Sequence, residues 1–249
     1  MKISLSNVVV TGAASGLGQS LTSGLVAQGV GVTCIDADAA RLNEHAEFLR
    51  AQGGRVTAVA ADVSDAAAIQ AAFASLADHP IDGLVTCAGV QSKTPILDLT
   101  TAEWDRVLAI NLRGTFLCVQ SALATMIPQE RGRIVTVASD TGKRGGGRLA
   151  KSAYSASKGA VIAFTRSIAR ELAPMQGRLR VNCLCPGPMS TQMHEGLTAD
   201  EIATVENSVP VGRFGKADEI AAGVLFLLSD EASFVYGETF CVDGGVIMD

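Results

Sequence analysis

Positive charge is not in excess in this chain. Lys and Arg number 20 against 25 Asp and Glu, which gives a net charge of −5 and a pI near 5.3. The basic residues are scattered along the sequence and form no patch. Because binding to a phosphate backbone depends on clustered cations, the composition argues against nucleic acid as a partner.

Long apolar runs are also missing. No uninterrupted apolar stretch approaches the roughly 20 residues that cross a bilayer. The amino-terminal MKISLSNVVVTG lacks the apolar core and cleavage site of a signal peptide. Low-complexity segments and shifts of composition are absent as well. We therefore expect one cytoplasmic domain spanning residues 1–249, with no membrane partner.

Aromatic residues make up only 4% of the chain and histidine occupies only three positions, whereas cysteine occurs six times. The cysteines mostly lie inside apolar runs, where a free thiol behaves as a small hydrophobic side chain. Cys183 and Cys185 would share one face of a strand, but no histidine or further cysteine cluster completes a ligand set. The sequence therefore predicts buried thiols and no metal site.

What the chain does contain is a regular alternation of short β-branched runs with longer helical patterns. The expected strands are residues 8–11, 32–36, 56–61, 84–87, 134–138, 181–185 and 239–242. The expected helices are residues 16–28, 39–52, 66–77, 102–126, 153–172 and 217–228. This order predicts an α/β protein with a parallel sheet covered on both faces, which binds ligands beyond the carboxyl ends of its strands.

A glycine-rich turn follows the first expected strand. Glycines at three positions of this turn allow a tight bend and let a pyrophosphate approach the amides at a helix amino terminus. The spacing differs from the commoner G-x-G-x2-G pattern, but the turn opens the first strand–helix unit. The cofactor contacts predicted here are Gly12, Ser15, Gly16, Leu17 and Gly18.

Asp36 ends the second expected strand. A carboxylate at this place accepts hydrogen bonds from the adenosine ribose and repels a 2′-phosphate, which favours NAD over NADP. The alternative role for Asp36 is a helix cap, because an Asp-x-Asp sequence precedes Ala39. Arg41 lies a turn further along and is expected to be a solvated helix residue.

Two more strand ends complete the adenosine side of the predicted site. Asp62 and Val63 follow the third expected strand, and Ala88 and Gly89 follow the fourth. We expect these positions to line the pocket for the adenine and its ribose, with Gly89 contributing its backbone.

Tyr154 and Lys158 are four residues apart in an expected helix, so they share one of its faces. A nearby lysine cation favours the phenolate and is expected to move the pKa of Tyr154 toward the working pH, which suits a general acid or base. Ser139 ends the fifth expected strand, where its hydroxyl could hold a substrate oxygen beside the tyrosine.

In this order the motifs closely resemble the short-chain dehydrogenase/reductase family, and within it the 3-oxoacyl reductases, over nearly the whole chain. The resemblance implies a seven-stranded, doubly wound Rossmann-like sheet and usually a homotetramer. It also implies roles for individual residues. Tyr154 would transfer the proton, Lys158 would bind the nicotinamide ribose, Ser139 would polarise the substrate oxygen, and Asn111 would steady a water that relays protons. Pro186, Gly187 and Thr191 would hold the carboxamide.

Two departures from the family pattern stand out. Thr86 and Cys87 replace the two asparagines that usually follow the fourth strand, which weakens any side-chain role there. The loop between Ser139 and Tyr154 is longer than is usual, so Thr141 competes with Ser139 for the serine role. We prefer Ser139 because it directly ends the strand.

The loop 140–151 contains four cations beside the predicted site. One hypothesis is that Arg144 and Arg148 recognise an anionic or polyhydroxylated substrate. The alternative is a solvated or subunit-facing loop. Met189 and His194, which follow the Pro-Gly turn, are further candidate substrate contacts.

The favoured function is an NAD-dependent oxidoreductase that interconverts a secondary alcohol and a ketone. Two alternatives stay open. The first is an NADPH-dependent 3-oxoacyl-thioester reductase, against which Asp36 argues. The second is a nucleotide-binding regulatory protein without catalysis.

Overall fold

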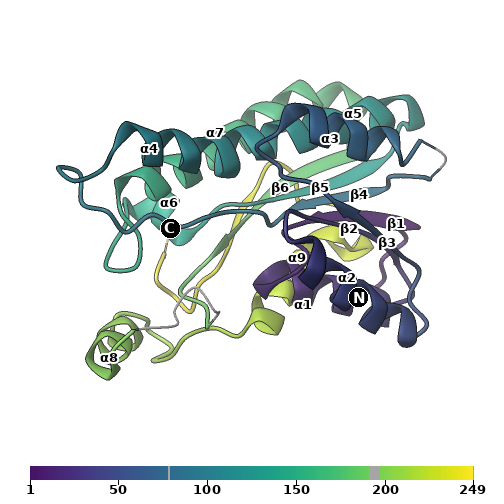
Figure 1. Cartoon of the computed structure of the whole chain (residues 1–249). Helices are drawn as coiled ribbons and strands as arrows, with labels where there is room; N and C mark the ends of the chain where they lie inside the picture. The colour runs from purple at the N-terminus through teal and green to yellow at the C-terminus, as the bar shows by residue number, and fades with distance from the viewer. Residues whose placement is uncertain (78, 191–196, 249) are drawn as a thin grey trace.

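Seven parallel strands form the centre of the molecule (Figure 1). A computed structural model describes residues 1–77, 79–190 and 197–248. The strand order across the sheet is β3-β2-β1-β4-β5-β6-β7. The strands are β1 (Asn7–Thr11), β2 (Gly31–Asp36), β3 (Val56–Ala60), β4 (Gly83–Thr86), β5 (Gly132–Val137), β6 (Leu179–Pro186) and β7 (Thr239–Val242). The predicted α/β fold with a seven-stranded parallel sheet is confirmed.

The strands are buried on both faces. In β1, Val8 and Val10 pack into the core on one face of the sheet and Val9 packs into the core on the other, all without solvent exposure. Successive side chains of a strand point to opposite faces, so a strand covered on both sides needs a continuous apolar run. This is why the strands appear in the sequence as β-branched runs without alternation.

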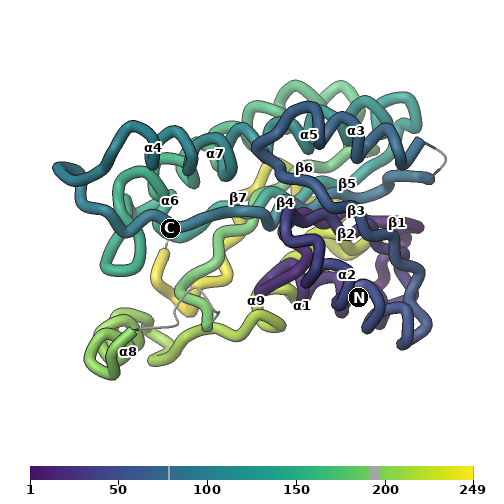
Figure 2. Tube along the Cα trace, viewed as in Figure 1, coloured from purple at the N-terminus to yellow at the C-terminus, as the bar shows by residue number. Residues whose placement is uncertain are grey.

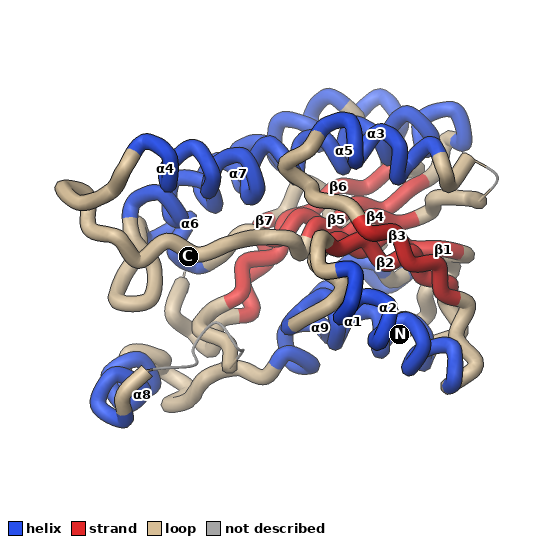
Figure 3. Tube along the Cα trace, viewed as in Figure 1, coloured by secondary structure: helices blue, strands red, loops and turns tan. Residues whose placement is uncertain are grey.

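Helices form a layer on each face of the sheet (Figure 3). On one face lie α1 (Gly16–Ala27), α2 (Ala39–Ala51) and α9 (Ala217–Leu228). The other face carries α3 (Ala66–Ala74), α4 (Thr101–Leu108), α5 (Gly114–Gln129) and α7 (Ser152–Glu171). The sheet is therefore doubly wound, as the alternation of strands and helices predicts.

The strand order reverses beside β1. This strand pairs in parallel with both β2 and β4. Strands β2 and β3 therefore lie on one side of β1, and strands β4 to β7 lie on the other side. After β1 the chain continues into α1 on one face of the sheet, and after β4 it continues toward α4 on the other face. Such a point in an open α/β sheet leaves room for a ligand beyond the carboxyl ends of the strands.

Two α-helices in the described residues were not predicted. The segment expected as a loop, 140–151, begins with the short helix α6 (Asp140–Arg144). Ser139 caps its amino terminus by accepting a hydrogen bond from the Thr141 backbone, and Gly145 ends it with a φ of 89°. The second helix, α8 (Ala199–Asn207), lies beside the sheet layers rather than within either of them (Figure 2).

The predicted helix 102–126 is interrupted. Between α4 and α5 the residues Ala109–Arg113 form a π-helical turn, which includes the fully buried Asn111. A π turn inserts an extra residue into the helix and changes the direction of the side chains around it, and such turns are frequent at functional sites.

In the described part of the chain, one helical segment, Thr101–Gln129, is long and apolar enough to span a bilayer by length and composition. The sequence contains no apolar run of that length because polar residues interrupt the pattern without ending the helix. Cys118, Val119, Ala122 and Met126 of α5 are buried in the core against the sheet. This segment is a core helix of the α/β fold.

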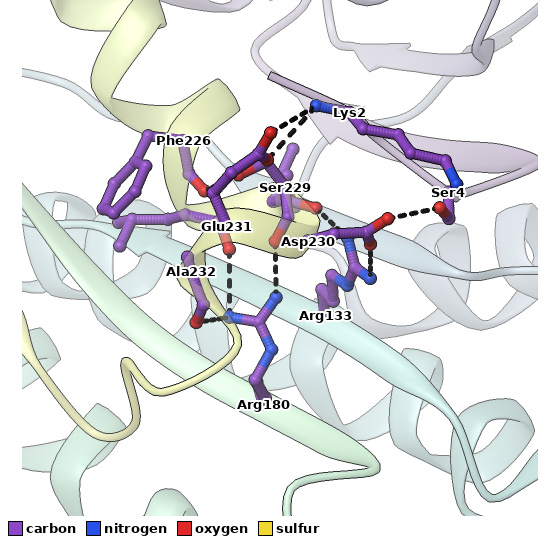
Figure 4. A network of polar contacts seen from close by, with 11 residues as sticks. Lys2, Ser4, Arg133, Arg180, Phe226, Ser229, Asp230, Glu231 and Ala232 are labelled. Atoms are coloured by element: carbon purple, nitrogen blue, oxygen red, sulfur yellow. Dashed lines mark hydrogen bonds and ion pairs between the residues drawn. The ribbon is translucent and has the colours of Figure 1, made fainter.

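Arg180 of β6 closes the carboxyl end of α9 (Figure 4). Its guanidinium is buried and donates hydrogen bonds to the carbonyl oxygens of Ala232 at 2.6 Å, Ser229 at 2.9 Å and Leu227 at 3.4 Å. The last carbonyls of a helix have no partner within it and interact favourably with a cation. Arg180 thus donates hydrogen bonds to the end of α9 and to the 3-10 turn Asp230–Ala232 that follows it.

The amino terminus joins the same network. Asp230 accepts hydrogen bonds from Arg133 of β5 and from the Ser4 hydroxyl, each at 2.5 Å. The Lys2 amide donates to the Glu231 carboxylate at 3.0 Å. These contacts fasten the first residues of the chain to the edge of the sheet opposite the strand carboxyl ends.

We predict that Arg180→Met lowers the free energy of unfolding by about 3 kcal/mol, because several buried carbonyls lose their donor. Urea unfolding followed by circular dichroism, at a fixed protein concentration, measures the change. Arg170→Met removes the same charge from the exposed end of α7 and should stay within about 0.5 kcal/mol of wild type. Equal stabilities of the two variants would contradict the proposed role of Arg180.

Candidate active site

A cleft of about 400 Å³ lies at the carboxyl ends of the strands. It brings together residues from the loops after β1, β2, β3, β4, β5 and β6, and from α7. The predicted site residues that line it are Gly12, Ser15, Gly16, Leu17, Gly18, Asp36, Asp62, Val63, Ala88, Gly89, Ser139, Arg144, Tyr154, Lys158, Pro186, Gly187 and Met189. Positions far apart in the sequence thus form one continuous surface.

The glycine-rich turn leaves no room for side chains. Gly12 has a φ of 65°, and a Cβ atom there would lie 2.7 Å from the amide nitrogen of Ala88. A Cβ atom on Gly18 would lie 2.2 Å from the Gly12 carbonyl oxygen. Ser15 precedes α1 in extended conformation, and its side chain does not cap the helix. The first residues of α1, Gly16, Leu17 and Gly18, line the cleft. The uncapped amino terminus of a helix favours an anion, which fits the pyrophosphate of a dinucleotide.

Asp36 orders the turns around it. Its carboxylate accepts hydrogen bonds from the amides of Ala14 at 2.9 Å and Asp38 at 3.0 Å. The cap of α2 is Asp38, whose side chain accepts from the Arg41 amide at 3.1 Å. The structure therefore assigns the capping role to Asp38 and leaves Asp36 at the cleft.

The strand ends on the adenosine side lie close to the catalytic end of the cleft. The Ala88 amide donates to the Thr11 hydroxyl at 3.2 Å. A Cβ atom on Gly89 would lie 3.3 Å from Asn111 Oδ1 and 3.5 Å from Lys158 Nζ. Cys87 also lines the cleft, and burial raises its thiol pKa to about 12, so the thiol stays protonated.

Tyr154 and Lys158 share one face of α7, as their spacing predicts. Lys158 Nζ lies 5.8 Å from the centre of the Tyr154 ring. It donates a hydrogen bond to the Val137 carbonyl oxygen, the last residue of β5, at 2.8 Å. The lysine side chain is buried, and it lines the cleft.

The expected lowering of the Tyr154 pKa is wrong in sign for this structure. Burial raises the pKa of Tyr154 to about 12; a hydrogen bond with Ser139 acts in the opposite direction, and the charge of Asp140 raises the pKa further. Burial also lowers the pKa of Lys158 to about 8. Desolvation is the largest cause of both pKa shifts and favours the neutral form of each group.

Asn111 lies behind the cleft and does not line it. Its Oδ1 accepts a hydrogen bond from the Val90 amide at 2.8 Å, and its Nδ2 donates to the Val90 carbonyl at 3.0 Å and to the Ser157 hydroxyl at 3.0 Å. The side chain thus fixes the loop after β4 against α7.

Ser139 and Thr141 both line the cleft. The Ser139 hydroxyl accepts from the Thr141 amide at 3.3 Å and from the Thr141 hydroxyl at 3.1 Å, and it donates to Asp140 Oδ1 at 2.9 Å. The two hydroxyls are hydrogen-bonded to each other, so the sequence-based choice between them stays a prediction.

Of the remaining predicted contacts, some line the cleft and others do not. A Cβ atom on Gly187 would lie 2.5 Å from the Asp243 Cα atom, so the Pro-Gly turn packs directly on the segment after β7. Arg148 does not line the cleft; its Nε lies 4.0 Å from a carboxylate oxygen of Glu201 in α8. Thr191 and His194 lie outside the described residues.

Sequence reasoning did not single out Asp140, although it lines the cleft and is buried. A signal was available, because Asp140 directly follows the serine that ends β5 and precedes Arg144 by four residues, a spacing that pairs charges on a helix. Gln91, Leu149 and Ala150 also line the cleft and carried no such signal.

No metal site is found among residues 1–77, 79–190 and 197–248. Within these ranges, no three His, Cys, Asp or Glu side chains lie close enough together to hold an ion. The six cysteines are free thiols, four buried and two half-buried.

Comparisons with known proteins identify the family of the chain. A family model described as enoyl-(acyl carrier protein) reductase matches residues 12–247. The chain is 38% identical over 248 residues to 2-(S)-hydroxypropyl-CoM dehydrogenase 3 of Xanthobacter autotrophicus, covering 96% of this chain and 95% of the relative. It is 37% identical over 245 residues to a 3-oxoacyl-(acyl-carrier-protein) reductase of Thermotoga maritima, covering 96% and 97% of the two chains.

A solved structure extends the likeness to three dimensions. The crystal structure of a 3-oxoacyl-(acyl-carrier-protein) reductase with bound NAD from Brucella melitensis matches with a TM-score of 0.90 at 33% identity, covering 98% of this chain and 91% of that one. The chain belongs to the short-chain dehydrogenase/reductase family and is an oxidoreductase acting on alcohol or ketone groups.

We predict that Lys158→Met stabilises the fold at neutral pH. The pKa of Lys158 is about 8 in the folded protein and 10.5 ordinarily, so the buried ammonium costs on the order of 3 kcal/mol below pH 8. Between these two values the unfolded chain binds more protons, and the free energy of unfolding of wild type rises with pH.

The stability advantage of Lys158→Met should therefore be large at pH 7 and smaller at pH 10. Urea unfolding at both pH values measures it, with Arg170→Met as the control for loss of a cation. An advantage that grows with pH, or a destabilised variant at pH 7, would show that burial does not disfavour the lysine charge.

Proposed function

We propose that this protein is an NAD-dependent oxidoreductase that interconverts a secondary alcohol and a ketone, with Tyr154 as general acid and base. The observation that carries the proposal is the single cleft, which joins the glycine-rich turn and Asp36 to Ser139, Tyr154 and Lys158. A hydride-transfer site needs the cofactor-binding residues and the proton-transferring residues side by side.

The cleft residues fit a nicotinamide dinucleotide from one end to the other. The amides at the start of α1 would bind the pyrophosphate, and Asp36 would accept hydrogen bonds from the adenosine ribose. Asp62, Val63, Ala88 and Gly89 would line the adenosine side. Lys158 would bind the nicotinamide ribose, and Pro186, Gly187 and Thr191 would hold the carboxamide. When bound, NAD supplies the carbon that takes or gives the hydride.

The preference for NAD rests on charge. Asp36 places a carboxylate where NADP carries its 2′-phosphate. In the described lining of the cleft the only cations are Arg144 and Lys158, and both lie at the Tyr154 end. A phosphate beside Asp36 would thus meet a negative charge without a compensating positive one. The Brucella melitensis reductase named above also binds NAD.

The buried pair Tyr154 and Lys158 supplies the proton chemistry. The high pKa of Tyr154 keeps its hydroxyl protonated and ready to donate to a ketone oxygen during reduction. In oxidation the phenolate must form, and the Lys158 ammonium beneath it stabilises that charge. Ser139 would hold the substrate oxygen. Asn111 would keep the loop after β4 in place and steady the predicted relay water.

The substrate is proposed to be a small alcohol or ketone that is anionic or polyhydroxylated. Arg144 lines the cleft, and its charge supports this assignment; Met189 also lines the cleft as a candidate contact. Arg148, which lies toward α8, and His194 stay predictions. A cytoplasmic location and a single domain stay predictions from the sequence, and a homotetramer stays a prediction from the resemblance to the family.

A second candidate function is an NADPH-dependent 3-oxoacyl-thioester reductase. The likeness to the Thermotoga maritima reductase favours it, and the charge of Asp36 opposes it. A purely regulatory nucleotide-binding protein would need none of the residues around Tyr154.

The test is a panel of secondary alcohols, polyols, sugars and hydroxy acids, scored by the absorbance of reduced NAD. Wild type should reduce NAD with at least one of them. Tyr154→Phe should lose about a thousandfold in kcat/KM, because the proton has no acceptor. The matched control is Tyr236→Phe, which removes the only other tyrosine and should retain activity. An active Tyr154→Phe variant would rule out the mechanism.

Cofactor preference is tested with Asp36→Asn. Removing the charge should shift the ratio of kcat/KM for NAD to that for NADP at least about tenfold toward NADP, because a like-charge repulsion is lost. Asp38→Asn removes the same charge two residues away, at the cap of α2, and should leave the ratio unchanged. A wild-type enzyme that already prefers NADP would overturn the assignment.

A further inference from the structure

Asp140 is a buried carboxylate in direct contact with a predicted catalytic hydroxyl. Its side chain is only 4% exposed. One oxygen, Oδ1, accepts the Ser139 hydroxyl at 2.9 Å, and the other, Oδ2, accepts the Arg144 Nε at 2.8 Å. A buried carboxylate is costly unless it is paired and hydrogen-bonded, so this arrangement demands a reason.

The hydrogen bonds of Ser139 hold its oxygen at the cleft, where the hydroxyl also interacts with Tyr154. A serine hydroxyl has one proton to donate and two lone pairs that accept. Here the proton goes to Asp140, and the Thr141 amide and hydroxyl occupy the acceptor side at 3.3 and 3.1 Å. Asp140 and Thr141 therefore fix the position of the Ser139 oxygen before substrate binds, and the hydroxyl proton turns from Asp140 to the substrate oxygen when it donates there.

Arg144 is held over Asp140 by its own surroundings. A Cβ atom on Gly147 would lie 3.1 Å from Arg144 Nη1, so the guanidinium rests on a glycine backbone. Gly145 and Gly146 have φ values of 89° and 103°, which turn the chain back beneath it. The run of three glycines thus shapes the loop around the Asp140–Arg144 pair.

The helix that carries this pair is locked to the helix that carries Tyr154. A Cβ atom on Gly142 of α6 would lie 2.7 Å from the Lys158 carbonyl carbon and 2.8 Å from the Gly159 nitrogen. The two backbones are in direct contact, so α6 cannot shift without moving α7.

We propose that the Asp140–Arg144 ion pair is a positioning unit of the active site, in which Asp140 holds the Ser139 hydroxyl in place at the cleft and Arg144 holds Asp140 and balances its charge. This inference rests on the proposed function, because Ser139 and Tyr154 are its targets. It also assigns Arg144 a role that does not require contact with the substrate.

The pair has a second consequence for the charge around Tyr154. The groups that influence its pKa are Asp140 and the Cys185 thiol, which raise it, and Ser139, which lowers it. Lys158 faces the ring from the same helix, and Lys143 lies near Cys185. Removing the Asp140 charge should thus ease deprotonation of Tyr154, and removing the Arg144 charge should hinder it.

The first experiment is the pH profile of kcat/KM for alcohol oxidation. Asp140→Asn should move the acidic limb about one pH unit lower, and Arg144→Met should move it higher. The double variant should fall between the two. Arg170→Met, the exposed charge control on α7, should leave the limb in place. The inference would be overturned if the acidic limb moved in the same direction in both single variants, or if it did not move in either.

A matched pair separates charge from hydroxyl orientation. Asp140→Asn and Asp140→Ala both remove the charge, but only asparagine keeps an oxygen that can accept the Ser139 proton. We expect kcat/KM on the pH plateau to be about tenfold lower for Asp140→Ala than for Asp140→Asn. Equal values would show that Asp140 does not position Ser139.

A measurement without substrate distinguishes failure of this inference from failure of the proposed function. In a Tyr236→Phe background, Tyr154 is the single tyrosine and gives one ring-carbon NMR resonance after 13C labelling. This resonance should begin to titrate at lower pH in Asp140→Asn than in the background protein. A titration shift without any dehydrogenase activity would remove the proposed function alone, whereas activity without a shift would remove this inference alone.

Discussion

The parallel pairing of the seven strands is the constraint on which the site depends. Because every strand runs in the same direction, all their carboxyl ends reach one edge of the sheet, and the strand order reverses beside β1 at that edge, where such sheets bind ligands. Gly12 lies so close to Ala88 that no side chain fits between these loops. The edge that receives a ligand is thus set by backbone packing before any side chain acts.

Burial is the second influence on the chemistry. It raises the pKa of Tyr154 and lowers that of Lys158, so desolvation shifts both groups toward neutrality. The nearest fixed negative charge, Asp140, raises the pKa of Tyr154 further and is balanced by Arg144. The electrostatics of the cleft therefore depend on α6 as well as on the pair in α7.

The sequence predicted those features that rest on local patterns. Buried parallel strands require continuous apolar runs, and the glycine turn and the Tyr154–Lys158 spacing each need only a few neighbouring residues to be recognised. Features that depend on contacts between distant segments could not be predicted from the sequence. One example is Asn111, which lies in a π turn and forms hydrogen bonds with Val90 and Ser157. These residues come from three segments, and no pattern in the sequence indicates that the segments meet. The boundaries of several strands differed by one or two residues for the same reason.

By itself the sequence determined the order of strands and helices, the glycine turn, the acidic residue that ends β2 and the family of the chain. Each of these features can be recognised from residues that lie close together along the chain. Only the tertiary structure decided that Asp38 rather than Asp36 caps α2, that Arg148 lies away from the cleft, and that burial governs the proton affinities of Tyr154 and Lys158. Desolvation and competition for a hydrogen-bond donor depend on everything that surrounds a group, and those surroundings exist only after the chain has folded.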